Sequence, residues 1–231
     1  NICKAAVTQI DITPDFPTDM IGCYRSDNRP DGVHAPLLAQ FLLLERHTTR
    51  CCLIAIYSLG LTVALSYDLR TAVAGTLGMD PSHVMLNFSH THSAPAPKSP
   101  LGGARYFALL RERVTAAAGQ AADALQPCLA AWALAETHIA ENRREGCDAV
   151  DRRLGALQLV RADDQTPLAV MLRISAHANT LMTHSAKLSS DFFGPARKKL
   201  SAYFGCPAML IQGDAGNLKP VGVGKISGGF P

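Results

Sequence analysis

Residues 84–93 read Val-Met-Leu-Asn-Phe-Ser-His-Thr-His-Ser, and the rest of the chain is organised around them. The first five residues are mostly apolar, which is typical of a buried strand. The polar cluster that follows places His90 and His92 at the strand end, where open α/β sheets bind ligands. Such a pair supplies two neutral nitrogen donors, and zinc prefers nitrogen and sulfur. Two histidines in a polar loop are the alternative interpretation.

The composition indicates a globular chain with a substantial core. Of 231 residues, 48% are hydrophobic and 18% are charged, so a disordered chain is excluded. The net charge is +3, and the one tight basic cluster, at 197–199, is typical of a solvated helix face. We therefore expect no nucleic-acid partner. No apolar run reaches the length that spans a bilayer.

The cysteines and the two ends of the chain leave the compartment open. The seven cysteines include no Cys-x-x-Cys motif, which favours buried free thiols, with one or two disulfides as the alternative. The chain starts at Asn1 and shows no signal peptide, so secreted, periplasmic and cytoplasmic locations all fit. The oligomeric state is equally open. The glycine-rich stretch 221–231 has no periodicity, and we expect the domain to continue beyond Pro231.

The first half of the chain predicts a hairpin followed by a parallel crossover. Apolar runs at 37–46 and 51–59 flank a short polar turn, which is a hairpin pattern. A helix is expected over 66–77, with Ser66 as its N-cap and Gly78 just past its end. Strand, helix and strand in succession imply a parallel pair. The remaining elements are a strand at 4–12 and a long irregular loop at 15–36.

The second half repeats this order of elements without a residue-level repeat. A second hairpin is expected, followed by a helix that starts at 189–191 and runs to about Tyr203. The expected ranges are a helix at 104–125, a strand at 129–138, hairpin strands at 154–160 and 168–175, and a strand at 208–212. The fold class is therefore α/β, a single domain over 1–231 with a mixed β-sheet built from hairpins and βαβ crossovers and flanked by helices.

A third histidine, His177, also follows an apolar strand. We therefore expect His90, His92 and His177 to meet at one edge of the sheet. With a carboxylate and a water they would form a catalytic zinc site that keeps one open position. Residues two apart in extended chain face the same side, so His90 and His92 could both reach the site. Only one need be a ligand, and the other could orient the water or protonate a leaving group. Taken alone, His177 is better interpreted as a core histidine bonded to a carbonyl.

Other polar residues are candidates for supporting roles. Asp191 follows two serines at a helix start, where a carboxylate is also simply favoured by the helix dipole. Asp214 and Asn217 lie in a glycine-rich turn whose backbone amides could cradle an anion. Arg143, in a polar connection, is either solvated or reaches a carboxylate or an oxyanion. His34, in the long loop, could line the site.

An ordered series of motifs resembles the neutral/alkaline (non-lysosomal) ceramidase family, in its N-terminal catalytic domain. The most specific is Ser-His-Thr-His-Ser-Ala-Pro at 89–95, close to the family's T-H-T-H-S-G-P. The resemblance covers essentially the whole chain. The other matching segments are 7–14, with its D-I-T-P ending, 22–24, 32–37, 142–144, 176–177, 189–194 and 212–220.

The resemblance implies an activity and roles for individual residues. The family uses one zinc to hydrolyse N-acylsphingosine to sphingosine and a fatty acid. By resemblance, His90 and His177 are the zinc ligands, His92 is an acid/base or water-orienting residue, and Arg143 binds the carbonyl or the product carboxylate. The family's other ligands, a glutamate and a tyrosine, are expected beyond Pro231. The implied partner is a small-molecule or lipid amide, and a lipid substrate would allow peripheral contact with a membrane.

Two departures from the family pattern define alternatives. The family often has Gly-Asp-x-Ser-Pro where this chain carries Asn217 in place of the aspartate and Lys219 in place of the serine. That serine is tied to ceramide turnover in the family. The sequence favours a zinc-dependent hydrolase of an N-acyl amide bond. The alternatives are a metal hydrolase of another amide or ester, and a degenerate member that binds a ligand without catalysis.

Overall fold

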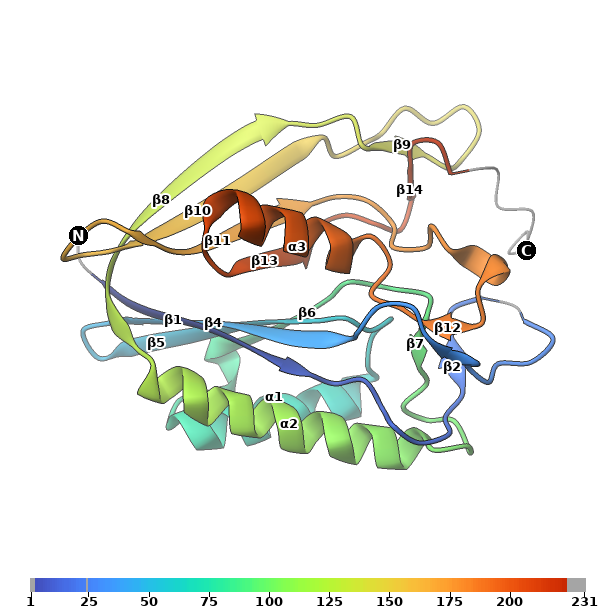
Figure 1. The fold of residues 1–231 in the computed structure, drawn as a ribbon, viewed down its shortest axis with the longest axis horizontal. Coiled ribbons are helices and arrows are strands. Elements are labelled where there is room, and N and C mark those ends of the chain that lie inside the picture. Colours follow the sequence, from blue (N-terminus) through green and yellow to red (C-terminus); the bar gives the residue numbers. More distant parts are fainter. Residues whose placement is uncertain (1–2, 24, 224–231) are drawn as a thin grey trace.

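An eight-stranded mixed sheet forms the centre of the computed structural model, which describes residues 3–23 and 25–223 (Figure 1). Tyr24 and most of the glycine-rich end, 224–231, lie outside the described residues. The strand order is β13-β11-β10-β8-β1-β4-β5-β6. The bounds are β1 Cys3–Asp11, β4 Leu38–Arg46, β5 Thr49–Ile56, β6 Val84–Phe88, β8 Gln126–Glu136, β10 Arg153–Arg161, β11 Pro167–Ile174 and β13 Ala208–Gln212.

The strand directions confirm the predicted mixture of hairpins and crossovers. β4 and β5 form one antiparallel hairpin, and β10 and β11 form the other. β5 pairs with β6 in parallel across α1 (Val63–Leu77), and β11 pairs with β13 in parallel across α3 (Phe193–Phe204). The fold class inferred from the sequence is therefore confirmed.

The two edge strands of this sheet meet. The side-chain amide of Asn87 on β6 donates to the Gln212 carbonyl on β13 at 2.9 Å, and the Gln212 N–H donates to Asn87 Oδ1 at 2.8 Å. From β4, the buried Gln40 amide donates to the Ala208 carbonyl at 2.7 Å. The sheet is thus folded into two layers, β1-β4-β5-β6 and β8-β10-β11-β13 (Figure 1). Leu42, Leu159 and other apolar side chains fill the core between them.

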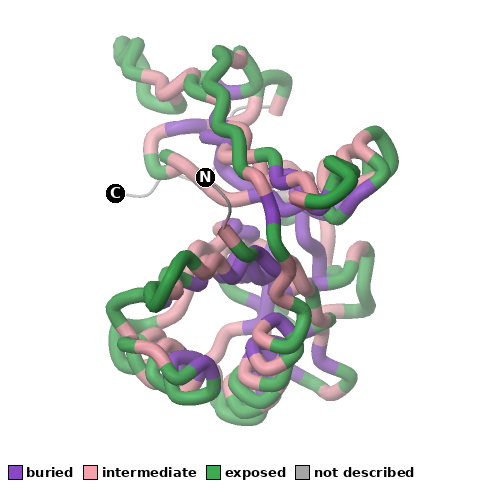
Figure 2. Tube along the Cα trace, turned by 90° about the vertical axis from the view of Figure 1, so that its left-hand side faces the viewer, coloured by how far each residue is buried: buried purple, intermediate pink, exposed green. Residues whose placement is uncertain are grey.

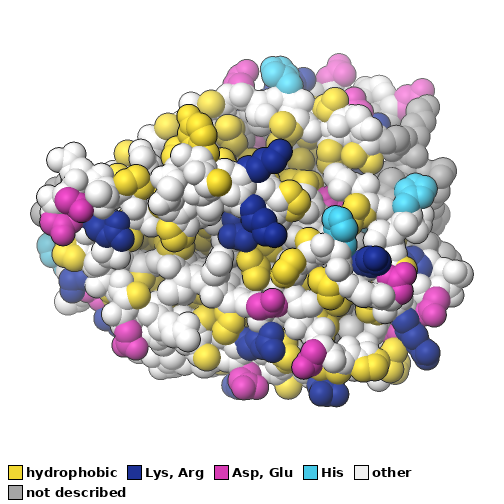
Figure 3. Space-filling model, in the orientation of Figure 1, with side chains coloured by type: hydrophobic (Ala, Val, Ile, Leu, Met, Phe, Trp, Pro, Cys, Tyr) yellow, Lys and Arg dark blue, Asp and Glu magenta, His cyan; other side chains and the backbone are white. Residues whose placement is uncertain are grey.

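Helices α1 and α2 (Gly103–Asp123) cover the layer formed by β1, β4, β5 and β6 (Figure 1). Their buried stripes follow the helical spacing seen in the sequence, with Leu69 and Val73 on α1 and Leu110 and Val114 on α2. The outward sides of these helices are exposed (Figure 2). On the face shown in Figure 3, basic and acidic side chains are interspersed rather than segregated. No helix among the described residues has the length and apolar character needed to cross a membrane.

Two of the three long helices begin elsewhere than predicted. The N-cap of α1 is Thr62, whose side chain accepts from the Leu65 N–H, so the prediction of Ser66 as N-cap is wrong. The predicted end is confirmed, because Gly78 adopts the left-handed conformation with φ 62°. α3 begins at Phe193, and Asp191 does not cap it. Pro195 lies in its first turn, where a missing N–H is tolerated.

Three short strand pairs shape the loops beside the sheet ends. β2 (Met20–Ile21) pairs with β7 (Ala94–Pro95), β3 (Gly32–Val33) with β12 (Lys187–Leu188), and β9 (Ala140–Asn142) with β14 (Leu218–Pro220). The predicted irregular loop at 15–36 therefore contains two short strands. Two 3₁₀ helices, Pro81–His83 and Met182–His184, complete the described elements.

Candidate metal centre

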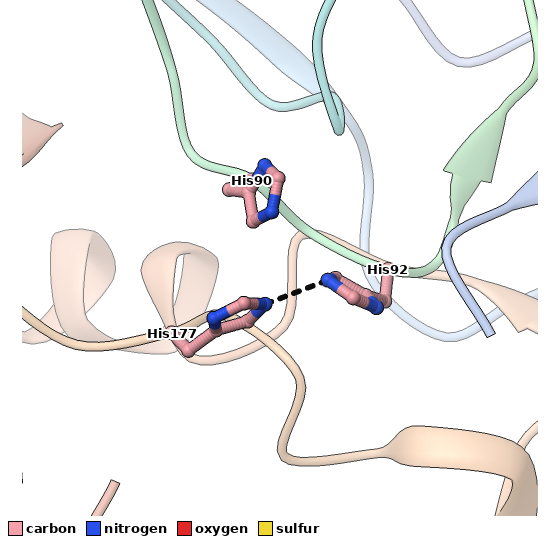
Figure 4. Close-up of side chains that lie close together, drawn as sticks. All are labelled: His90, His92 and His177. Atoms are coloured by element: carbon pink, nitrogen blue, oxygen red, sulfur yellow. Dashed lines mark hydrogen bonds between the residues drawn. The ribbon is translucent and has the colours of Figure 1, made fainter. Parts of the chain in front are cut away.

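His90, His92 and His177 lie together where the two layers of the sheet meet (Figure 4). The first two follow β6, and the third follows β11. The ring centroids are 4.7 to 5.2 Å apart, and one nitrogen from each ring lies within 4.8 Å of the others. Among the described residues, these three side chains form the one group able to hold a metal ion.

His90 is held by backbone carbonyls from the segment that follows β5. Its N–H donates to the Ser58 carbonyl at 2.9 Å, and its Nδ1 donates to the Leu59 carbonyl at 2.8 Å. A carbonyl only accepts, so the ring proton is on Nδ1 and Nε2 keeps its lone pair. The backbone of His90 has φ 60°, a strained conformation for a non-glycine residue that is common at functional sites.

His177 is oriented in the same way from the other layer. Its side chain is buried, and its Nδ1 donates to the Ala215 carbonyl at 2.9 Å. Nε2 of His177 therefore also keeps its lone pair. It lies 2.7 Å from Nε2 of His92. Two acceptors do not attract, so a hydrogen bond at this distance places a proton on the His92 nitrogen.

The loop that carries Ala215 is fixed by a buried carboxylate. The Asp214 N–H donates to Ser175 Oγ at 3.1 Å, and the Ser175 hydroxyl donates to Asp151 at 3.1 Å. Arg173 and Arg153 pair with the same carboxylate at 2.5 and 2.7 Å. Hydrogen bonds from Arg153 and then Arg173 hold the pKa of Asp151 well below its usual range. This chain of contacts links Asp151 indirectly to the orientation of His177.

His92 packs against the residues that follow β2. Its N–H donates to the Ala178 carbonyl at 3.2 Å, and its Nδ1 lies 3.7 Å from Cys23 Sγ. The Arg25 guanidinium donates to the His92 carbonyl at 3.1 Å. Gly22 has φ 117°, and a Cβ built there would lie 2.8 Å from the His92 Cα. Only glycine fits so close to this histidine.

The surroundings keep two of the rings neutral. Burial, with smaller contributions from His177 and His90, lowers the pKa of His92 to about 4. Burial and the nearby His90 also lower the pKa of His177 to about 4. The guanidinium of Arg143 is close enough to add to both shifts. Neutral imidazole is the form that binds metals, and both rings hold it at neutral pH.

The structure gives the other predicted residues different surroundings. Arg143 is exposed, and its backbone N–H donates to the Asn217 carbonyl at 2.9 Å. Asp191 is buried, but its carboxylate accepts from Thr180 Oγ1 at 2.7 Å and the Leu181 N–H at 3.3 Å, so it anchors that loop.

The remaining predicted residues lie in the loops around the histidines. His34 is exposed and lies 3.3 Å from Ser189 Oγ. Asp214 is exposed, and the Asn217 amide donates to the Ala149 carbonyl at 2.9 Å. None of these side chains belongs to the three-histidine group of the described residues.

Several groups at the site have no signal in the sequence. The carbonyls of Leu59 and Ala215 fix two ring tautomers, and any residue type could supply a carbonyl. Asp151 lies in a polar connection that looks solvated, and its role depends on Ser175 and Arg173 from another strand. Cys23 belongs to a recognised motif, but its contact with His92 comes from folding alone.

The fold and this site define a mixed α/β protein with a histidine cluster where the sheet edges meet. Its fold is similar to that of part of neutral ceramidase. The structure of neutral ceramidase from Pseudomonas aeruginosa superposes with a TM-score of 0.83 at 18% identity, over 98% of this chain and 41% of the other. A ceramidase complexed with C2 gives 0.81 at 18% identity, over 97% and 40%.

The chain thus spans about two fifths of the length of these ceramidases. At this level of identity the likeness is one of fold. No protein-family model and no curated protein matches the sequence.

Proposed function

We propose that this chain carries part of the active site of a zinc-dependent hydrolase that cleaves an N-acyl amide bond, as in N-acylsphingosine. The observation that carries the proposal is the convergence of three imidazoles, two of which present Nε2 lone pairs fixed by backbone carbonyls. The ceramidase-like fold and the motif at 89–95 support the same reaction class.

The donor set suits zinc. Neutral imidazoles are preferred zinc ligands, and their tautomers are usually set by a second hydrogen bond such as those to Leu59 and Ala215. His90 and His177 would hold the ion. The close approach of the His92 and His177 Nε2 atoms fits a proton held between them. His92 therefore serves as a third donor or as the acid/base.

The chemistry that zinc supplies when bound is Lewis acidity, which polarises an acyl carbonyl and lowers the pKa of water. His92, neutral at physiological pH, can accept the proton of the attacking water and deliver it to the leaving amine nitrogen. The exposed guanidinium of Arg143 would stabilise the oxyanion and bind the carboxylate product.

Exposed apolar side chains on or next to the short strand pairs support a substrate with an acyl chain. Ile21 and Val33 are 40% and 48% exposed, and Ile139 and Val221 are 42% and 57% exposed. The last two adjoin each other, because the Val221 N–H donates to the Ile139 carbonyl at 2.9 Å. Exposed apolar groups in these loop regions suit a lipid amide or a membrane surface that presents it.

The surroundings of Asn217 and Lys219 favour a second candidate, a hydrolase of another amide or ester. The Asn217 amide is bonded to the Ala149 carbonyl, and Lys219 Nζ pairs with Glu141 at 2.9 Å. Both side chains already bind partners in the β9–β14 region. Neither is therefore available for the role that the serine has in the family. A ligand-binding member without catalysis remains the third candidate.

Zinc analysis and a substrate screen test the proposal on the full-length protein. We expect bound zinc in the wild type and its loss in both His90→Ala and His177→Ala, while the exposed His83→Ala control retains it. Hydrolysis of N-acylsphingosine, small N-acyl amides and esters, followed by mass spectrometry, separates the three candidates. If both histidine variants keep the wild-type zinc content, the ligand assignment is wrong.

A further inference from the structure

Two thiols meet far from the histidines, at the joint between the two layers of the sheet. Cys3 opens β1, and Cys128 lies near the start of β8, directly opposite in the antiparallel pairing. Directly opposed residues point to the same face of a sheet. The two Sγ atoms are 3.5 Å apart. Cys3 is half-buried and Cys128 is buried.

Cys3 and Cys128 lie in the strand pairing that joins the two layers of the sheet. Within the described residues, β1 pairs with β8 over residues 3–5, whereas it pairs with β4 over residues 4–11. Among the described strands, this short ladder is the backbone strand pairing that connects the layer β1-β4-β5-β6 with the layer β8-β10-β11-β13. A covalent bond between Cys3 and Cys128 would therefore reinforce the joint where the sheet passes from one layer to the other.

We propose that Cys3 and Cys128 are a disulfide-forming pair that ties β1 to β8. Residues directly opposite in an antiparallel sheet have Cα atoms about 4.5 to 5.5 Å apart, which lies within the range that disulfides span. The sulfurs must approach from 3.5 Å to about 2.05 Å. Rotation of the side chains supplies this change without moving the paired strands.

The oxidant is a small disulfide such as oxidised glutathione. The more accessible Cys3 attacks first as its thiolate, and it forms a mixed disulfide while releasing one glutathione thiolate. Cys128 then loses its proton and attacks the Cys3 sulfur, which releases the second glutathione. One S–S bond is broken and one is formed, two protein thiols are oxidised, and two glutathione molecules are produced. Burial raises the pKa of Cys128 to about 12, so Cys3 rather than Cys128 makes the first attack.

The bond would close a loop from residue 3 to residue 128 and would restrict the unfolded chain. For a loop of this length we expect the thermal midpoint to rise by about 10 °C. The start of β1 lies at the opposite end of the molecule from β7 and the loops that follow the histidines (Figure 1). Zinc content and hydrolysis should therefore be the same in the oxidised and reduced proteins.

Peptide mapping of the full-length protein tests the pair. The reduced protein is incubated with oxidised glutathione, blocked with an alkylating reagent and digested without reductant. We expect a linked peptide that contains Cys3 and Cys128, and a higher thermal midpoint that reductant reverses. Cys3→Ser and Cys128→Ser should lose both effects, and the exposed Cys51→Ser control should keep both.

Two results would overturn the proposal. One is recovery of Cys3 and Cys128 from the oxidised wild type as separate alkylated or glutathionylated peptides. The other is a reductant-sensitive rise of the same size in Cys3→Ser. Both measurements hold even if the buried Cys128→Ser variant does not fold.

Discussion

Asn87 and Gln212 exchange two hydrogen bonds, at 2.9 and 2.8 Å, and thereby join the two edge strands of the eight-stranded sheet. The Asn87 side-chain amide makes the two hydrogen bonds that backbone groups make between neighbouring strands of a sheet. β6 leads into His90 and His92, and β13 leads into the loop that carries Ala215, the partner of His177. The contact between Asn87 and Gln212 therefore sets the distance between the two halves of the histidine site.

Replacing Asn87 with Ala should separate these edges. The substitution leaves the partly buried N–H and carbonyl of Gln212 without their partners, which costs about 2 to 4 kcal/mol of unfolding free energy. Zinc affinity should fall as well, because the proposed ligands His90 and His177 would no longer be held at a fixed distance from each other. Urea unfolding and zinc titration measure the two effects. The exposed Asn28→Ala is the control, and equal stability of the two variants would contradict the argument.

Local patterns were sufficient to predict the mixed α/β class and its two hairpins. Apolar runs around short polar turns identify β4, β5, β10 and β11, because the signal for a hairpin is contained in the strands and their turn. The meeting of β6 with β13 was not predictable, because it depends on one amide at 87 and a backbone at 212. The helical pattern does not locate the start of α1, because Thr62 caps the helix one turn before Ser66.

The candidate site was predictable where a histidine follows an apolar strand. That pattern alone selected His90, His92 and His177, which the structure brings together. The pattern does not predict the ring orientations, because these depend on the backbone carbonyls of Leu59 and Ala215. A residue of any type has such a carbonyl, so the sequence carries no signal for it. The ceramidase resemblance adds the proposed division of roles among the three histidines.

The contact of Gly22 with His92 offers a way to separate ligand from helper. Gly22→Ala places a methyl group 2.8 Å from the His92 Cα in a backbone conformation with φ 117°. We expect a loss of about 1 to 3 kcal/mol in stability and displacement of His92. If His92 is the acid/base, hydrolysis should fall at least about tenfold while zinc content is unchanged.

Gly216→Ala is the matched control for this variant. Nothing lies within 4 Å of a Cβ built at Gly216, so zinc content, activity and stability should stay close to wild type. Parallel loss of zinc and activity in Gly22→Ala would instead make His92 a ligand. Zinc analysis and steady-state kinetics on the same preparations distinguish the two outcomes.

Arg143 should affect hydrolysis more than metal binding. Its guanidinium is exposed, and it adds to the lowering of the His92 and His177 pKa values. Removal in Arg143→Ala should reduce kcat/KM by about 10- to 1000-fold through loss of oxyanion stabilisation. Zinc content should be unchanged. Arg144→Ala, at the exposed neighbouring position, serves as the control, and equal effects of the two changes would argue for general charge rather than a specific contact.

Asp151 should make the stability of the protein depend on pH in acid. Hydrogen bonds from Arg153 and Arg173 depress the folded-state pKa of this carboxyl, so the unfolded chain binds more protons as the pH falls. Its contribution is fully present above the unfolded pKa of about 4 and is lost as the pH falls below it. At pH 7 we expect Asp151→Asn to lower the unfolding free energy by about 2 kcal/mol.

The difference between wild type and Asp151→Asn should therefore shrink between about pH 5 and pH 2. Zinc affinity should also fall, by up to about tenfold, because Asp151 holds the loop whose Ala215 carbonyl orients His177. Denaturant titrations across this range and zinc titrations at pH 7 measure the two effects, with the exposed Asp148→Asn as the control. A stability difference that stays constant from pH 7 to pH 2 would show that the ionised carboxylate of Asp151 is not what stabilises the loop.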